Sequence, residues 1–403
     1  MAVLPIPFPE NLRVAGIRLG TARAGIRSGP GDDLAVIELA PGSQVAAVFT
    51  RNAFCAAPVR VAKEHLAYQP RWLLINAGNA NAGTGAQGIE DARATCAALA
   101  RLAGGQPQHV LPFSTGVIGE PLPVAKICAA LPQALSSLRE SGWESAARAI
   151  LTTDTCPKGA RLELFLAGRR VTIAGIAKGA GMIAPNLATM LAFIGTDAHV
   201  AAEDLQLALA HALEPSFNAI SVDGDTSTND ACALMATGAA GGPQLTREHP
   251  DFPAFLDGLT QVCTRLAEAI VRDGEGATKL IRIRVEEAQD QDEARRVGMA
   301  VANSPLVKTA FFASDPNWGR ILAAVGRAVE DLDIARVRIW LDEVCIVAAG
   351  GRAPEYREEL GKAVMARPEI EVRIALGRGR SAIQVLSCDL SYEYVRINAA
   401  YRS

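Results

Sequence analysis

A threonine in the middle of the chain, Thr189, stands where it could act on the chain's own backbone. Residues 178–194 read KGAGMIAPNLATMLAFI; they follow one β-like run, 171–176, and lead into another, 190–195. Because glycine and proline disfavour regular structure, we expect an irregular loop before Thr189 and a strand after it. At such a junction the threonine hydroxyl could attack the carbonyl carbon of Ala188. Hydrolysis of the resulting ester would then leave Thr189 as a new N-terminus.

A free N-terminal threonine would carry both groups that nucleophilic catalysis needs. An α-amino group titrates at about 7.7 to 8.0, so a useful share is neutral near pH 7 and can take the hydroxyl proton without a histidine. Taken alone, however, a glycine-rich loop that contains a threonine is most often a simple turn. The segment therefore raises the hypothesis of an N-terminal nucleophile and does not establish it.

The elements that must position this loop alternate between strands and helices along the whole chain. Short apolar runs typical of strands are interspersed with apolar residues at helical spacing, so we expect a mixed α/β or α+β fold. A polar stretch at 286–296 is expected to be an exposed connection, with a possible second structural domain from about 290 to 403. The expected strands are 34–37, 45–49, 72–75, 280–285, 337–341, 370–376 and 383–386, and the expected helices are 89–102, 205–213 and 259–270, the last ending at Gly274.

Composition limits the classes of protein to consider. The 403 residues are 49% hydrophobic and 21% charged, which is typical of a globular protein with a large core. The net charge is −3 and there is no long Lys/Arg run, so nucleic acid is not expected as a partner. The N-terminal residues resemble no signal peptide, and no apolar stretch of about 18 residues follows, which predicts a cytoplasmic protein that does not enter a membrane.

Other motif-like segments point to structure and not to cofactors. The eight cysteines are scattered without a Cys-x-x-Cys pair, so we expect reduced thiols and no zinc site. Residues 76–85 lack the Lys-Ser/Thr of a phosphate-binding loop and are interpreted as a tight structural loop. The acidic residues Asp223, Asp225 and Asp230 lack the terminal glutamate of a calcium loop. They are interpreted as a turn near the active site, and no metal or other cofactor is expected.

Residues 178–193 resemble the ornithine acetyltransferase family, also called the bifunctional glutamate N-acetyltransferase/amino-acid acetyltransferase of arginine biosynthesis. The family's hallmark is cleavage inside an Ala-Thr-Met segment such as 188–190. The resemblance covers essentially the whole chain. Its further motifs are VFTRN at 48–52, NAGNAN at 76–81, STGVIG at 114–119, TTDT at 152–155, DGDTSTND at 223–230, DGEG at 273–276 and DPNWGR at 315–320.

The resemblance implies a fold and a reaction. The fold would be that of autoprocessed N-terminal-nucleophile enzymes of the ornithine acetyltransferase/DmpA-like type, with sheets packed against helices. Cleavage would give an alpha chain, 1–188, and a beta chain, 189–403, that stay together, as an α2β2 heterotetramer. Thr189 would take the acetyl group from N2-acetylornithine and pass it to glutamate in a ping-pong reaction. Some members also accept acetyl-CoA, and nothing in this sequence decides that point.

The resemblance also assigns residues to the site. Thr115 and Gly116 would form the oxyanion hole, an arrangement in which a hydroxyl and a backbone N–H face the developing negative charge. Either Thr152 or its neighbour Thr153 would contact substrate. A cation such as Lys178 suits an α-carboxylate, and an anion such as Glu275 suits an ammonium, although the two could merely pair with each other. The implied substrate contacts are Thr152, Lys178, Thr189, Glu275, Asn398 and Ser403; threonine is expected to be commoner than serine at the last position.

Two other functions stay open at this point. One is an autoprocessing aminopeptidase of related architecture, which would hydrolyse a peptide bond; its known relatives use serine, so Thr189 argues against it. The other is an amino-acid-binding protein that keeps the fold and is never cut.

Overall fold

Two stacked β-sheets form the body of the protein. The computed structural model describes residues 2–184 and 190–400. The first sheet has the order β1-β2-β4-β5, in which only the β4/β5 pair is parallel. The second has the order β3-β10-β8-β7-β6, in which only the β8/β10 pair is parallel. The strands are β1 Ile17–Ala22, β2 Leu34–Leu39, β4 Trp72–Asn79, β5 Val110–Val117, β3 Gln44–Phe49, β10 Ala231–Ala236, β8 Leu191–Thr196, β7 Arg169–Lys178 and β6 Lys158–Leu166.

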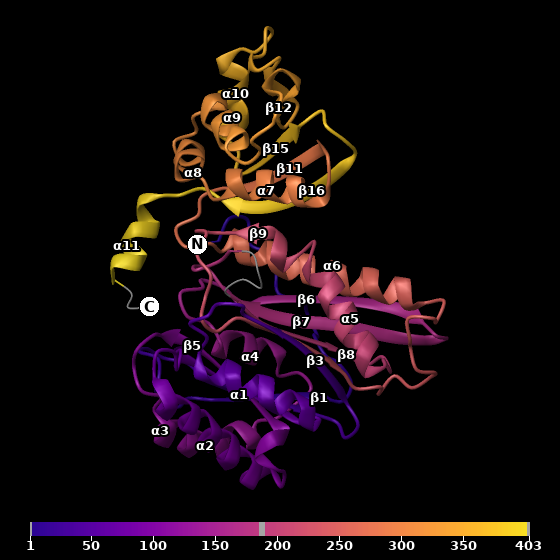
Figure 1. The fold of residues 1–403 in the computed structure, drawn as a ribbon. Helices are drawn as coiled ribbons and strands as arrows, with labels where there is room; N and C mark the ends of the chain where they lie inside the picture. Colours follow the sequence, from indigo (N-terminus) through magenta and orange to yellow (C-terminus); the bar gives the residue numbers. More distant parts are fainter. Residues whose placement is uncertain (1, 185–189, 401–403) are drawn as a thin grey trace.

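Helices cover the outer face of each sheet, so the body has four layers in the order α/β/β/α (Figure 1). One apolar core lies between the sheets, where the rings of Phe113 on β5 and Phe193 on β8 meet edge to face, 5.1 Å apart. Because the inner strands are covered on both faces, β8 and β10 are buried along their whole length. The helices are α1 Ala57–His65, α2 Gly85–Ala103 and α3 Val124–Ser136 at the first sheet, α4 Trp143–Ala149 between the sheets, and α5 Ala202–Leu213 and α6 Phe252–Arg272 over the second.

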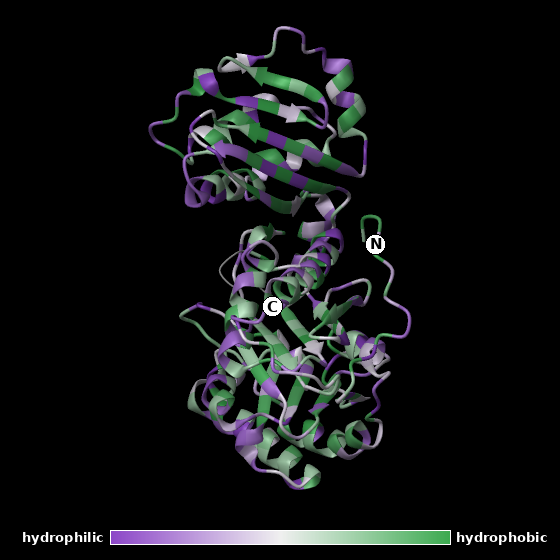
Figure 2. Ribbon diagram, turned by 90° about the vertical axis from the view of Figure 1, so that its right-hand side faces the viewer, coloured by the Kyte–Doolittle hydropathy of each residue, from purple (hydrophilic) through white to green (hydrophobic). Residues whose placement is uncertain are grey.

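A third sheet stands above the body and carries its own helices on one face (Figure 1). Its strand order is β14-β13-β12-β15-β11-β16-β9. Hydrophilic and hydrophobic bands alternate along its strands in Figure 2, as expected for a sheet with one face packed and the other exposed. Its elements are β9 Ile220–Ser221, β11 Leu280–Ala288, β12 Arg338–Leu341, β13 Val344–Ala348, β14 Gly351–Arg352, β15 Glu369–Ala375, β16 Ser381–Cys388, α7 Gln291–Ala302, α8 Pro305–Phe312, α9 Trp318–Gly326 and α10 Glu358–Met365.

The third sheet is joined to the body at several places. The short strand β9, which follows α5 in the chain, pairs in parallel with β16 and forms one edge of the sheet, and α6 leads into β11. After β16 the chain turns back towards the body and forms a last helix, α11 Tyr392–Ala400, which stands apart from the other helices in Figure 1. None of its side chains is buried, although two of them reach the cavity described below.

The mixed α/β class expected from the alternating pattern is confirmed, and each strand and helix named from the sequence has a counterpart. The exposed connection expected at 286–296 is shorter than predicted, because residues 289–292 are exposed but only 289–290 lie between a strand and a helix. Strand β11 continues to Ala288, and α7 begins at Gln291 with the Asp290 carboxylate accepting from the backbone N–H of Glu293 at 2.8 Å. Glu293 is itself buried and lies 3.0 Å from Arg378. Asp290 therefore caps a helix and Glu293 is a buried partner of Arg378, so only part of the polar stretch is solvated.

Candidate active site

A cavity of about 180 Å³ opens where the ends of β5 and β7 meet the loop at 223–229 and the helix α11. Most of the residues that the sequence singled out lie around it, although they are far apart in the chain. Ala188, Thr189 and Ser403 lie outside the described residues. The lining includes Thr115, Gly116, Thr152, Thr153, Lys178, Glu275 and Asn398.

The oxyanion-hole candidates, Thr115 and Gly116, lie at the end of β5. Gly116 has a φ of +134°, and a Cβ atom there would approach the carbonyl carbon of Gly78 on the neighbouring strand to 2.3 Å. Only glycine fits this backbone position, because an L side chain is disfavoured at such a φ and has no room. The close approach of β4 to β5 therefore fixes the strand end that carries both candidates.

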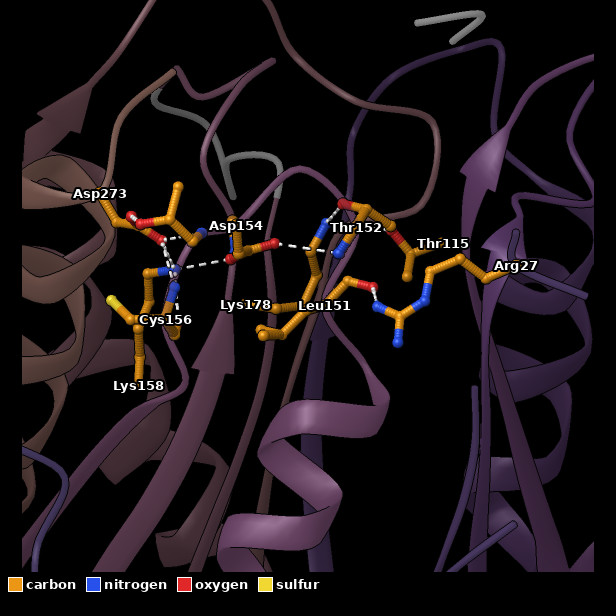
Figure 3. A network of polar contacts seen from close by, with 11 residues as sticks. Arg27, Thr115, Leu151, Thr152, Asp154, Cys156, Lys158, Lys178 and Asp273 are labelled. Carbon is orange, nitrogen blue, oxygen red and sulfur yellow. Dashed lines mark hydrogen bonds and ion pairs between the residues drawn. The ribbon is translucent and has the colours of Figure 1, made fainter. Parts of the chain in front are cut away.

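Lys178, the last residue of β7, is buried and forms hydrogen bonds with two threonines (Figure 3). Its ammonium group donates to Oγ1 of Thr152 at 2.9 Å and to Oγ1 of Thr115 at 3.1 Å. The bond to Thr152 distinguishes this residue from Thr153, although both line the cavity. Burial lowers the pKa of Lys178, while the nearby carboxylates of Asp154, Asp230 and Glu275 act in the opposite direction.

Glu275 is one of the acidic residues that line the cavity and does not pair directly with Lys178. Its carboxylate accepts from Nδ2 of Asn398 on α11 at 2.6 Å, and its backbone N–H donates to the carbonyl of Ala180 at 2.8 Å. A Cβ atom on Gly181 would lie only 2.4 Å from the Glu275 carboxyl carbon, so glycine there leaves the room that this carboxylate occupies. A fixed cation and a fixed anion thus line one small cavity.

The acidic segment 223–230 contributes Asp223 to the backbone contacts beside the cavity. Asp223 lines the cavity, and its carboxylate accepts from the backbone N–H groups of Met182 at 2.6 Å and Ile183 at 2.9 Å and from the hydroxyl of Tyr394 at 3.2 Å. Within residues 2–184 and 190–400, no three His, Cys, Asp or Glu side chains are grouped as metal ligands. The turn at 223–225 instead holds the backbone at 182–183 beside the cavity.

A buried ion triad, Asp154–Lys158–Asp273, lies directly behind the cavity and was not anticipated from the sequence (Figure 3). The ammonium of Lys158 lies 2.6 Å from the Asp154 carboxylate and 2.7 Å from that of Asp273, and no side chain of the three is more than 1% exposed. Burial alone would raise the pKa of Asp154, but the charges of Lys158 and Lys178 outweigh burial and hold this pKa well below its usual range.

Little in the sequence could have revealed the triad. Asp154 and Asp273 each lie in a motif that carries the family resemblance, but both stand in polar turns, where an aspartate is ordinary. Lys158 is the first residue of β6 and looks like a surface charge at the start of a strand. Asp273 follows Lys158 by 115 positions in the chain, so only the tertiary structure brings the two together.

The described residues contain no helix long and apolar enough to cross a membrane. All eight cysteines are free; four are buried and four are partly exposed.

Comparisons with known proteins point to one family. The sequence model of the ArgJ family matches residues 18–403. The arginine biosynthesis bifunctional protein ArgJ of Methylococcus capsulatus is 63% identical over 391 residues, 97% of this chain and 96% of that protein. The protein of the same name from Psychrobacter arcticus is 54% identical over 407 residues, 100% of each. The crystal structure of ArgJ from Bacillus halodurans has 40% identity and a TM-score of 0.51; the match covers 53% of this chain and 100% of that one.

Proposed function

The chain belongs to the ArgJ family, and we propose that it transfers the acetyl group of N2-acetyl-L-ornithine to L-glutamate through an acetyl ester of Thr189. It is an acetyltransferase of arginine biosynthesis. The 63% identity to a bifunctional arginine biosynthesis protein favours acyl transfer over the aminopeptidase and the uncut binding protein considered from the sequence.

The observation that carries the proposal is the pairing of opposite charges around one cavity. An α-amino acid presents a carboxylate and an ammonium a few ångströms apart. Lys178 has three N–H donors and uses two of them for the threonines, so the third can bind the carboxylate. Glu275, whose carboxylate is oriented by Asn398, can bind the ammonium. Acetylornithine, ornithine and glutamate all carry the α-carboxylate. The α-nitrogen is an amide N–H in the acetylated donor and an ammonium in the free amino acids, and the Glu275 carboxylate can accept from either, so one site can serve donor and acceptor in turn. Ser403 completes the set that the family resemblance implies.

The chemistry divides into two half-reactions with the same machinery. In the first, the free α-amine of Thr189 takes the hydroxyl proton, and Oγ1 attacks the acetyl carbonyl carbon. The Thr115 hydroxyl and the Gly116 N–H stabilise the oxyanion. The C–N bond then breaks, and the proton passes from the Thr189 amine to the leaving amine of ornithine. In the second, the neutral amine of glutamate attacks the acetyl ester, Thr189 regains its proton, and N-acetylglutamate leaves.

Cleavage before Thr189 would not release the two fragments. β7 in the alpha chain pairs with β8 in the beta chain from Ile173↔Thr196 to Lys178↔Leu191, and β3 pairs with β10. The whole of the solved Bacillus halodurans chain matches 53% of this chain. Residues 189–403 make up the same share of the 403 residues, and this agreement supports a separate beta chain. An α2β2 assembly, a cytoplasmic location and the use of acetyl-CoA as a second donor belong to the same proposal.

The first experiment compares the intact mass of the purified protein with that of the Thr189→Ala variant. We expect two fragments that meet between Ala188 and Thr189 in the wild type and one uncut chain in the variant. A wild type that is folded, soluble and uncut would contradict the mechanism. Ornithine release from acetylornithine is then measured with glutamate and with water alone. Release that is no faster with glutamate would indicate a hydrolase instead of a transferase.

A further inference from the structure

The hydrogen bonds of Lys178 determine which way the Thr115 hydroxyl points. An ammonium group has three N–H donors and no acceptor, so the oxygens of Thr115 and Thr152 must both accept from it. The hydroxyl hydrogen of Thr115 is then directed away from Lys178. Because Thr115 lines the cavity, this hydrogen can serve a group bound there.

A neutral Lys178 would remove this constraint. A neutral amine has a lone pair, so the Thr115 hydroxyl could donate to the lysine nitrogen. The hydrogen needed by an oxyanion would then be engaged elsewhere. With a charged Lys178 the oxyanion hole has two donors, the Thr115 hydroxyl and the Gly116 N–H. With a neutral Lys178 only the Gly116 N–H remains.

Lys178 is buried, and burial disfavours its charged form. The charged groups that face it are the carboxylates of Asp154, Asp230 and Glu275, which favour the ammonium, and the ammonium of Lys158, which opposes it. Of these carboxylates, Asp154 is the one that binds two backbone N–H groups next to the lysine. One belongs to Gly179, which follows Lys178 in the chain, and the other to Thr152, whose hydroxyl accepts from Lys178. Oδ1 of Asp154 accepts from the N–H of Gly179 at 2.6 Å, and Oδ2 accepts from the N–H of Thr152 at 3.2 Å.

The rest of the triad holds Asp154 in place. Lys158 lies between the carboxylates of Asp154 and Asp273, and Asp273 also accepts from the backbone N–H of Thr155 at 2.9 Å (Figure 3). On the other side, a guanidinium N–H of Arg27 donates to the carbonyl of Leu151 at 2.7 Å, next to Thr152. The loop at 151–156 is therefore fixed from both directions.

We propose that Asp154 is a positioning residue of this site: its carboxylate keeps Lys178 charged, and the charged Lys178 keeps the Thr115 hydroxyl directed at the oxyanion. This inference rests on the proposed function, because it needs an acyl-transfer intermediate at Thr115. No bond is made or broken by Asp154, and no proton leaves Lys178 during turnover.

The test is the pH dependence of kcat for Asp154→Asn, with Asp273→Asn as the matched control. Asparagine keeps the size of the side chain in both variants, and each variant leaves Lys158 one carboxylate. Removing the charge of Asp154 lowers the pKa of Lys178, so the alkaline limb of the profile should move to lower pH by roughly one unit or more. The acid limb, which reports the Thr189 amine, should stay at the same pH.

The control variant tests the rest of the triad. Asp273 contacts Lys158 and the 155–156 backbone, so Asp273→Asn should lower thermal stability without moving the alkaline limb.

Thr115→Val provides a second test that does not depend on how well the Asp154 variant folds. Without the hydroxyl, the charge of Lys178 has no hydrogen to direct, so the alkaline limb of kcat should disappear. In the double variant, Asp154→Asn should add little to the loss of kcat at alkaline pH. An alkaline limb that persists in Thr115→Val, or a full additional loss in the double variant, would overturn the inference. A loss confined to KM would assign Lys178 to carboxylate binding alone.

The intact mass of each variant separates this inference from the proposed function. If the wild type is cut and transfers acetyl groups but Asp154→Asn leaves the alkaline limb in place, only the role of Asp154 fails. If the wild type is uncut or inactive, the proposed function fails first.

Discussion

Two neighbouring residues at the end of α6, Arg272 and Asp273, belong to two ion clusters that differ in burial. Asp273 belongs to the buried triad behind the cavity. Arg272 belongs to a second cluster, which joins α6 to β11 and β15 of the third sheet. We call this cluster, made of Glu268, Arg272, Arg282 and Glu369, the strap. The ion pairs of the strap are Arg272–Glu268 at 2.6 Å, Arg272–Glu369 at 2.8 Å, Arg282–Glu268 at 2.8 Å and Arg282–Glu369 at 2.6 Å.

The two clusters have similar distances, so their difference lies in access to water. Side chains of the strap are between 9% and 35% exposed, whereas those of the triad are at most 1% exposed. An exposed charge that loses its partner is solvated again, whereas a buried one is not. The more exposed members of the strap, such as Arg282, can therefore be lost at little cost. The triad must be complete, and this makes it suitable for fixing atoms beside an active site.

The largest effect is expected from Lys158→Met, which leaves two buried carboxylates without their cation. Breaking a buried ion pair from one side costs about 3 to 5 kcal/mol. The loss should appear as a lower free energy of unfolding in urea. It is best measured in the uncut Thr189→Ala background, where unfolding involves one chain.

The pH dependence of this loss has a definite sign. In the parent, the pKa of Asp154 is lowered, so the carboxylate contributes stability above its unfolded pKa and loses it as the pH falls. In Lys158→Met, the loss of this cation moves the pKa of Asp154 upward, because burial is then opposed only by Lys178 and the backbone N–H groups. The variant should therefore lose less stability on acidification than its parent. A deficit below about 1 kcal/mol at pH 7 would contradict the distinction between the two clusters.

A neutral version of the triad should separate stability from function. The triple variant Asp154→Asn, Lys158→Met, Asp273→Asn leaves no unpaired charge within the triad itself. Neutral replacement of a whole buried ion cluster is often nearly neutral for stability, so we expect the triple variant to recover at least about half of the Lys158→Met deficit. Its kcat at alkaline pH should stay low, because Lys178 has lost Asp154. Recovery of both stability and kcat would indicate that the triad is only structural.

The sequence predicted the regular elements because their signal is local. Leu205, Leu209 and Leu213 recur at helical spacing, and α5 presents that face to the core. The motifs at 114–119, 152–155 and 273–276 also identified segments that meet at one cavity. In each case a short stretch of chain contains the information.

The failures concern charges whose role depends on burial. The sequence places Glu293 in an exposed connection and gives no signal for Lys158, although each is buried and has an ionic partner. An alternating strand such as β6 begins equally well with a solvated or a buried lysine. Only the position of Asp273, set by the packing of α6 on the second sheet, distinguishes the two cases. The amino acids near a charge in sequence do not determine how much water reaches it.

The smallest effect is expected in the strap, where Arg282→Met should lower the free energy of unfolding by no more than about 1 kcal/mol. Arg272 still pairs with both glutamates in this variant, and methionine keeps much of the apolar stem. Since the strap is partly exposed, the loss should shrink further in about 1 M salt, where charges are screened beyond roughly 3 Å. The Lys158→Met deficit should be nearly independent of salt.

Arg284→Met is the matched control on the same strand. Arg284 is 52% exposed and its ion pair with Glu286 is longer, at 3.4 Å, so no measurable change is expected. A salt-independent loss at Arg282 comparable to that at Lys158 would mean that the strap fixes the third sheet as firmly as the triad fixes the site.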